Sequence, residues 1–434
     1  MSTPTASDSE KLPIIFDDHT DPTTIELQYF IDTRIGKNTC KARCEFCFLD
    51  REHISDFHQD VEQAREMIDK LRAKGYKVVP IVSDSFAENG KYLRSGIFHN
   101  NDGWYMGNAA WSSGRPLLED NYNEMLDLCV DNGIHTIIMT SHGTEDRERE
   151  FKGLTQPSIV REAVRRIKEY TERTGWQLRI ILTFTLSRRN SSAEDIRRYF
   201  DYCESLEVHV ARFNQFADMR NTHPQLRMSP DDVSRTYRTL REVYDSRTGK
   251  VQLSVSEDFG FWGVEVMNFP EGVGHCVAGE RLFGVVYPYV YACPVNLTVV
   301  SGKLTEDGDI AWDEAAYQRL MRAKDHPEFG GCIGVAYPHS PEIQQMLEPA
   351  VMKPELMDLE PAPAELAMPG LTWPGMPAAR GSASYAVPVL GPALTPPDLA
   401  TPALTTGSQA RPAEAQPELV QIRLGRTQST TTRE

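Results

Sequence analysis

From residue 25 to about residue 260, short apolar runs alternate with amphipathic segments whose apolar residues recur every three or four positions. This alternation is typical of βα units built around a parallel sheet. We predict strands over 25–35, 78–82, 136–139, 178–186, 208–213 and 251–255. We predict helices over 61–74 and 122–130, and further helices that begin at Ser158, Ser192 and Ser229. Six such units are fewer than the eight of a closed barrel.

Three cysteines, Cys40, Cys44 and Cys47, come directly after the first predicted strand, at the end of the sheet where barrel enzymes carry their active sites. Thiolates favour zinc, copper(I) and iron–sulfur clusters over hard cations. A structural zinc site has four protein ligands, whereas this run provides three. The metal would keep one open coordination position, which is typical of a catalytic site. The alternatives are a partial zinc site or three thiols without a metal.

The Cys-x3-Cys-x2-Cys spacing, with Phe46 before the last cysteine, resembles the signature of the radical S-adenosylmethionine (SAM) enzymes. The resemblance implies an open, TIM-like (β/α)6 partial barrel. It also implies that the three thiolates hold a [4Fe–4S] cluster, that the fourth iron chelates SAM, and that Phe46 lies against the cofactor. Reductive cleavage of SAM would yield a 5′-deoxyadenosyl radical, with flavodoxin or ferredoxin as electron donor.

The same family usually follows its second strand with a Gly-Gly-Glu-Pro-like turn that binds the amino group of SAM. The best match begins at Ser112, so the resemblance assigns cofactor binding to Ser113, Gly114 and Arg115. Arg115 stands where an acidic residue is expected, and a guanidinium cannot accept a hydrogen bond from an ammonium group. Either backbone carbonyls accept that bond, or Arg115 binds the SAM carboxylate, or the turn at 83–85 holds the role.

Ser187 and Arg212, on the strands predicted over 178–186 and 208–213, resemble family contacts to the ribose and carboxylate of SAM. An ordinary surface or core role is the alternative for each. His142 follows the strand over 136–139 and is expected to point toward the barrel mouth. The acidic residues Asp84, Glu257 and Asp258 are candidate proton donors or acceptors there.

Beyond the barrel, Cys276, Cys293 in Val-Tyr-Ala-Cys-Pro, and Cys332 resemble the twitch and SPASM extensions of radical SAM enzymes. The resemblance implies an auxiliary iron–sulfur cluster in a small α+β domain. A non-cysteine fourth ligand, for which His275, Asp325 and His326 are the closest options, or an open site would complete it. Three buried thiols without a cluster are the alternative.

The other two cysteines, Cys129 and Cys203, lie on apolar helical faces and are expected to be core residues. Residues 84–118 are long for a connection and rich in aromatic residues, so an ordered lid is expected. From residue 349 the sequence is rich in Pro, Ala and Thr and predicts a disordered tail. The predicted parts are an extension at 1–24, the core at 25–260, the auxiliary domain at 261–348 and the tail at 349–434.

A formal net charge of −16 argues against a nucleic-acid substrate. No targeting segment and no apolar run of membrane-spanning length are present, so a cytoplasmic protein without a membrane partner is expected. Eight cysteines in 434 residues are also too few for a secreted disulfide scaffold.

The resemblance implies a radical SAM oxidoreductase or lyase. The favoured substrate is a small polar metabolite of the sugar, aminoglycoside or nucleoside type found in antibiotic pathways, which would be oxidised, dehydrated or rearranged. The second hypothesis is modification of a ribosomally made peptide. Fewer than about thirty residues precede the first strand, too few for a leader-binding domain, which favours the metabolite. A zinc-stabilised binding module is the hypothesis from another class.

Overall fold

The structure is a computed structural model, and all the residues it describes lie in the first of two compact units, residues 1–372. The described residues are 12, 14–16, 24–34, 40, 44, 47, 57–99, 108–143, 147, 149, 156–216, 218, 223–255, 277–295, 297, 299–329, 333, 337 and 340–348. The predictions for Phe46, Glu257, Asp258, Cys276 and Cys332 lie outside these residues. The predicted tail from residue 349 also lies outside them.

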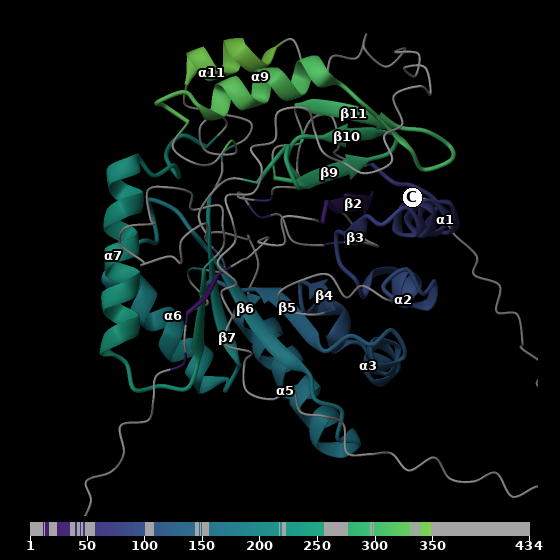
Figure 1. Cartoon of the computed structure of the whole chain (residues 1–434). Coiled ribbons are helices and arrows are strands. Elements are labelled where there is room, and N and C mark those ends of the chain that lie inside the picture. Colours follow the sequence, from purple (N-terminus) through teal and green to yellow (C-terminus); the bar gives the residue numbers. More distant parts are fainter. Residues whose placement is uncertain are drawn as a thin grey trace, which may run out of the picture. The chain divides into compact units, whose positions relative to one another are not determined.

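The described strands form two six-stranded sheets (Figure 1). The first has the order β1-β8-β7-β6-β5-β4, and every neighbouring pair in it is parallel. Its strands are β1 (Ile15–Phe16), β4 (Ala109–Ser112), β5 (Thr136–Thr140), β6 (Arg179–Leu186), β7 (Val210–Gln215) and β8 (Gln252–Val255).

The second sheet has the order β12-β11-β10-β9-β2-β3. Its strands are β2 (Glu26–Asp32), β3 (Lys77–Val82), β9 (Leu282–Val286), β10 (Tyr289–Tyr291), β11 (Val300–Leu304) and β12 (Ile310–Trp312). β2 is parallel to both β3 and β9, whereas β9 to β12 are antiparallel. The two sheets meet beyond β3, where the Ser85 N–H donates to the Trp111 carbonyl at 2.8 Å. β2 to β8 thus form an open parallel barrel, as predicted.

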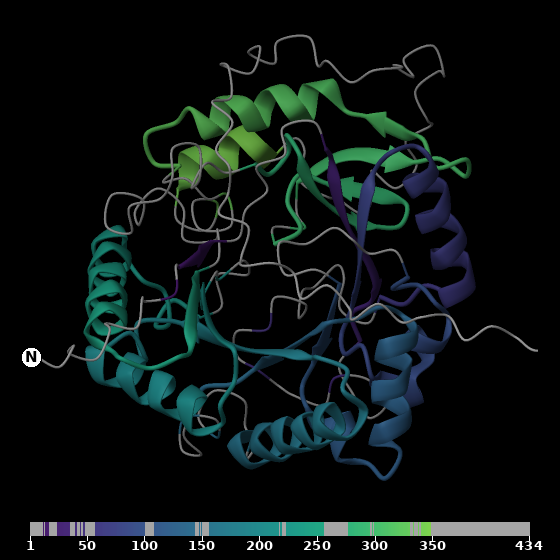
Figure 2. The same ribbon diagram turned by 60° about the horizontal axis from the view of Figure 1, so that its bottom comes forward.

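Helices follow the parallel strands in turn and lie on their outer side (Figure 2). They are α1 (Val61–Ala73), α2 (Ala87–Arg94), α3 (Tyr122–Asp131), α5 (Gln156–Thr174), α6 (Ala193–Ser205) and α7 (Pro230–Ser246). Ser192 and Ser229 cap α6 and α7, as predicted. Ser158 does not cap a helix, because α5 already begins at Gln156.

The prediction of a lid over 84–118 is wrong in its described part. That segment holds α2, β4 and the short 3₁₀ helix η1 (Arg115–Leu118), which together complete another βα unit. β4 escaped prediction because it has only four residues, Ala-Ala-Trp-Ser, and so lacks a clear apolar run. The strand counted third in the sequence, β5, is therefore the fourth, and six βα units precede β8.

Alternate residues of the parallel strands pack against the helices, and Cys129 and Cys203 join this core at 0% exposure, as predicted. Burial raises the pKa of both thiols, so they are inert core groups. In the described part of the chain, no helix is both long and apolar enough to cross a membrane. A small C-terminal group, α9 (Glu314–Lys324) and α11 (Pro341–Leu347), packs in a separate cluster that includes Cys293.

The strand residues that face away from the helices form two layers inside the barrel. An apolar layer consists of Ala109, Ile138, Ile181 and Val210. Two residues farther toward the C-terminal ends lies a second layer, which we call the polar layer: Thr140, Thr183, Arg212 and Ser254, each paired in register with the next across β5 to β8. The barrel thus changes from apolar to polar toward the end at which active sites form.

Candidate functional site

The three cysteines of the signature lie after β2, at the C-terminal end of the parallel strands. All three are partly buried, and none forms a disulfide with another described residue. The Cys47 N–H donates to the Cys44 carbonyl at 3.1 Å. Cys47 also packs against an apolar cluster that includes Phe30 of β2, and Ile81 of β3 packs against the same cluster. The sheet therefore presents the cysteine segment at the barrel mouth, where the sequence placed it.

Cys40, Cys44 and Cys47 offer sulfur donors, which zinc, copper(I) and iron–sulfur clusters prefer. Within the described ranges, no three His, Cys, Asp or Glu side chains come close enough together to hold one metal ion. A [4Fe–4S] cluster places each thiolate on a different iron, so its ligands lie farther apart than those of a single ion. The cluster predicted for Cys40, Cys44 and Cys47 stays a prediction. Cys293 is buried at 6% exposure, and the auxiliary cluster proposed around it stays a prediction.

Both ends of the cysteine segment are joined by hydrogen bonds that close its base. The Thr33 N–H donates to the Phe57 carbonyl at 3.0 Å, and the Gln59 N–H donates to the Ile31 carbonyl at 2.9 Å. Asp32 and His58 form an antiparallel bridge between these bonds. The segment therefore leaves β2 and returns beside it.

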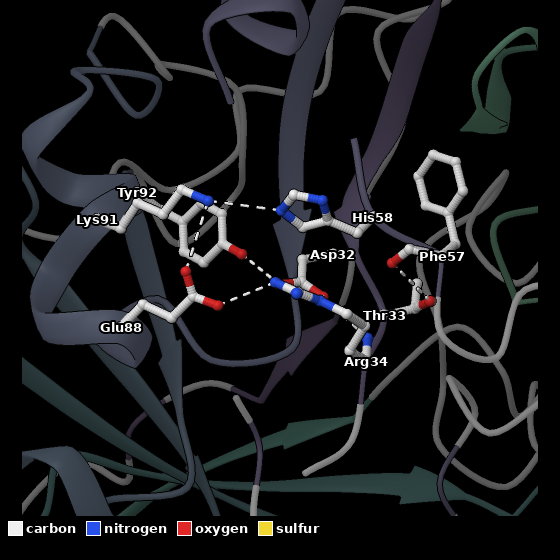
Figure 3. A network of polar contacts seen from close by, with 8 residues as sticks. All are labelled: Asp32, Thr33, Arg34, Phe57, His58, Glu88, Lys91 and Tyr92. Carbon is white, nitrogen blue, oxygen red and sulfur yellow. Dashed lines mark hydrogen bonds and ion pairs between the residues drawn. The ribbon is translucent and has the colours of Figure 1, made fainter. Parts of the chain in front are cut away.

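A charged network surrounds this base (Figure 3). The Asp32 carboxylate, at 0% exposure, accepts from the backbone N–H of Arg34 at 2.9 Å and from its guanidinium at 2.7 and 3.0 Å. It also accepts from the Tyr92 hydroxyl. Burial by itself raises the pKa of Asp32, but the hydrogen bonds from Arg34 and Tyr92 and the charge of Arg34 lower it below its ordinary value. Asp32 is therefore an anion at neutral pH.

Two α2 residues extend this network. Glu88 accepts from the Arg34 guanidinium at 2.9 Å and lies 3.5 Å from the Lys91 ammonium. The Lys91 ammonium lies 3.4 Å from Nε2 of His58. The sequence analysis missed these residues, because they meet only in the fold. The one signal available was the charged pair Asp32-Thr-Arg34 directly before the cysteines.

The turn predicted to bind the amino group of SAM does not follow the second strand. Ser112 ends β4, the third parallel strand, and Ser113 and Gly114 lead into η1. Arg115 is exposed. The second strand, β3, is instead followed by residues 83–85, the alternative position. The assignment of 112–115 by strand order is therefore wrong, while a role of these residues in cofactor binding stays a prediction.

Asp84 joins the two turns. Its carboxylate accepts from the Phe86 N–H at 3.1 Å, from the Ser113 N–H at 2.8 Å, and from the hydroxyls of Ser113 at 2.7 Å and Ser112 at 3.3 Å. Burial raises the pKa of Asp84 despite these hydrogen bonds. With all four donors supplied by the protein, Asp84 holds β3 and β4 together at the mouth.

The other predicted contacts separate into two environments. Ser187 is buried, and its N–H and hydroxyl both donate to Asn190 Oδ1, at 2.7 and 3.0 Å. Arg212 lies in the polar layer at 5% exposure, 5.9 Å from the ring centroid of Trp111. His142 does not point to the mouth. Its ring centroid lies 5.2 Å from that of Phe184, in a pocket also lined by Tyr199 of α6, so it faces the helices.

Next to Arg212, three buried polar atoms lack a hydrogen-bond partner among the described residues: the hydroxyls of Thr183 and Ser254 and the side-chain carbonyl of Asn214. Thr183 and Ser254 pair with Arg212 in register, and Asn214 follows it on the same face of β7. A buried, unpaired hydroxyl costs about 1–3 kcal/mol. This polar layer therefore has the character of a ligand site.

No protein-family model matches the chain, and no curated protein matches it. Solved structures do. Streptococcus suis SuiB bound to the precursor peptide SuiA is similar with a TM-score of 0.51 at 12% identity, over 69% of this chain and 67% of SuiB. Another SuiB structure gives 0.50 at 11% identity, over 72% of each chain. The anSMEcpe protein with bound AdoMet and the Cp18Cys peptide gives 0.49 at 14% identity, over 74% of this chain and 95% of that one.

The likeness to the two SuiB structures shows that the chain shares their fold, an α/β fold with an open parallel barrel, which is the fold class that the sequence predicted. At these identities the likeness defines the fold alone. The chain spans about two thirds of the length of peptide-bound SuiB.

Proposed function

We propose that the chain is a radical SAM enzyme in which Cys40, Cys44 and Cys47 hold a [4Fe–4S] cluster. When bound, the cluster would supply the electron that cleaves SAM to a 5′-deoxyadenosyl radical. The observation that supports this proposal is that the three cysteines follow β2 at the C-terminal end of an open parallel barrel, whose fold is similar to that of SuiB. Flavodoxin or ferredoxin is the proposed electron donor.

The protein's own residues would bind and orient the two reactants. Ser187 and Arg212 are assigned to SAM, as the resemblance implies. Thr183, Asn214 and Ser254 would hydrogen-bond the polar groups of SAM or of the substrate, and this would offset the burial of their unpaired atoms. A small polar metabolite would suit this polar layer, because its polar groups could hydrogen-bond the unpaired side-chain atoms of Thr183, Asn214 and Ser254.

The second candidate substrate is a ribosomally made peptide. The observation that favours it is the similarity to SuiB in a structure that contains the precursor peptide SuiA. In either case, Cys276, Cys293 and Cys332 are proposed to bind an auxiliary cluster near the substrate.

Anaerobic reconstitution with iron and sulfide, followed by an iron count and an assay for 5′-deoxyadenosine, tests the proposal. We expect a brown protein with about four irons per chain for one cluster, or about eight for two. Cys40→Ala should lose SAM cleavage. Cys129→Ala is the matched control, because it removes a core thiol and should retain iron. A colourless wild-type protein that does not cleave SAM would instead favour the zinc-stabilised binding module.

The substrate class needs a separate experiment. The small-molecule and peptide fractions of a deuterated cell extract are each incubated with the reconstituted enzyme and SAM. Deuterium in 5′-deoxyadenosine from the first fraction supports the metabolite, and deuterium from the second supports the peptide. Deuterium from neither fraction would contradict both assignments.

A further inference from the structure

The first turn of α2 has an unusual backbone. Glu88, Asn89 and Gly90 have φ values of 50°, 58° and 72°, so three consecutive residues adopt the left-handed conformation. For a residue with a Cβ atom this conformation costs roughly 1–2 kcal/mol. Such strain persists only where the surrounding structure enforces it, and it concentrates at functional sites.

Packing against α3 enforces the strained turn. A Cβ atom on Gly90 would lie 2.8 Å from the sulfur of Met125, so any other residue would require this α3 side chain to shift. Asn89 accepts a hydrogen bond from the Asn121 side chain. At the other end of the helix, Arg94 donates to Glu124 at 2.7 Å. α3 therefore holds α2 as a fixed element beside the cysteine segment.

The strained turn directs two side chains to opposite ends of the cysteine segment (Figure 3). Glu88 reaches Arg34, which precedes the cysteines, at 2.9 Å. Lys91 reaches His58, which follows them, at 3.4 Å. Glu88 and Lys91 also face each other at 3.5 Å. Glu88, the first residue of this left-handed stretch, and Lys91, the residue that follows it, thus contact the entry and the exit of the segment.

We propose that Glu88 and Lys91 are positioning residues that hold the two ends of the cysteine segment together and so preorganise its thiolates for the cluster. This inference rests on the proposed function of the segment. Fixing both ends of a loop removes conformational freedom that ligand binding would otherwise have to restrict. Mutation of residues that support metal ligands typically lowers metal affinity 10–100-fold.

The charge balance of the network favours a geometric role. Asp32 and Glu88 face Arg34 and Lys91, so two carboxylates oppose two cations. Because the two negative and two positive charges oppose one another, their electrostatic effects on the cysteine sulfurs largely cancel. The effect of the network on the cluster should therefore come from the position of the loop.

Glu88→Gln tests the inference, because it keeps the size of the side chain and removes the charge that binds Arg34. Glu124→Gln is the matched control, because it breaks an ion pair on the same helix without reaching the cysteine segment. In reconstituted protein we expect Glu88→Gln to release iron to a chelator about 10-fold faster than wild type. The electron paramagnetic resonance signal of its reduced cluster should also broaden. Glu124→Gln should match wild type in both.

The thermal midpoint of each metal-free variant separates positioning from a general loss of stability. Faster iron release from Glu88→Gln with a midpoint equal to that of Glu124→Gln supports the inference. Equal iron release from the two variants overturns it, while the function proposed for the chain stands. A wild-type protein that binds no iron overturns both. If Glu88→Gln does not fold, Lys91→Gln makes the same test from the other end of the segment.

Discussion

Two buried aspartates at neighbouring strand ends have opposite electrostatic environments. Asp32 ends β2 and Asp84 follows β3, and both have 0% exposure. Asp32 is paired with the Arg34 guanidinium, whereas the donors to Asp84 among the described residues are neutral, namely two backbone N–H groups and two hydroxyls. The pKa of Asp32 is accordingly lowered and that of Asp84 raised. Neutral donors orient a buried carboxylate, and a nearby cation keeps it charged.

The largest difference should appear when each side chain is removed. Asp84→Ala leaves four donors without their acceptor, and we expect a loss of about 3 kcal/mol in the free energy of unfolding. Asp32→Ala should lose less, about 1–2 kcal/mol, because the Arg34 side chain is 33% exposed and can turn to water. Urea denaturation of both metal-free variants measures the difference. A larger loss for Asp32→Ala would show that the Asp32–Arg34 ion pair stabilises the fold more than the hydrogen bonds to Asp84.

A smaller effect is expected from Gly90→Ala, which disturbs only the Asp32 side of the comparison. The new methyl group would meet Met125 at 2.8 Å, so we expect a loss of about 2 kcal/mol. Gly133→Ala is the control, because Gly133 has a similar φ of 65° but nothing within 4 Å of the added atom. The free energy of unfolding of Gly133→Ala should fall by only about 1 kcal/mol, the cost of placing a residue with a Cβ atom in the left-handed conformation. Equal losses in thermal or urea unfolding would show that packing against α3 adds nothing to the stability of the turn at Gly90.

The smallest effect, and the one that tests the comparison most directly, is the pH dependence of stability. The pKa of Asp32 lies below its ordinary value of 3.8, so its contribution is present above pH 3.8 and is lost as the pH falls through the lowered pKa. The pKa of Asp84 lies above 3.8, so its contribution is present below pH 3.8 and is lost as the pH rises through the raised pKa.

Urea unfolding of Asp32→Asn and Asp84→Asn across this range should therefore show opposite trends relative to wild type. With rising pH, the free energy of unfolding of Asp32→Asn should fall increasingly below that of wild type. The free energy of unfolding of Asp84→Asn should rise relative to that of wild type. Parallel trends would mean that the two carboxyl groups share one environment.

Much of the fold could be predicted because its signals are local. The apolar runs of β2, β3 and β5 to β8 and the caps Ser192 and Ser229 depend on neighbouring residues only. β4 was missed because its four residues, Ala-Ala-Trp-Ser, are too few to show a periodicity. That omission displaced the expected SAM turn by one strand.

The cysteine segment was found from spacing alone, but its supports were not. Arg34 and Glu88 are far apart in sequence, and nothing in either residue's surroundings indicates the other. The left-handed conformation of Glu88 and Asn89 is equally invisible, because neither is a glycine. The polar layer left a weak signal in the alternation of Thr183 and Thr185 along a buried strand.

The parallel pairing of β9 with β2 has a consequence for biosynthesis. β2 leaves the ribosome early, whereas β9, whose Leu282 pairs with Glu26, is made much later. Until then, one side of β2 is an unpaired edge open to other chains. The strand that leads into Cys40, Cys44 and Cys47 therefore becomes an interior strand only after most of the barrel has been translated. Nascent chains that stop before Leu282 should aggregate more readily than chains that extend beyond Val286.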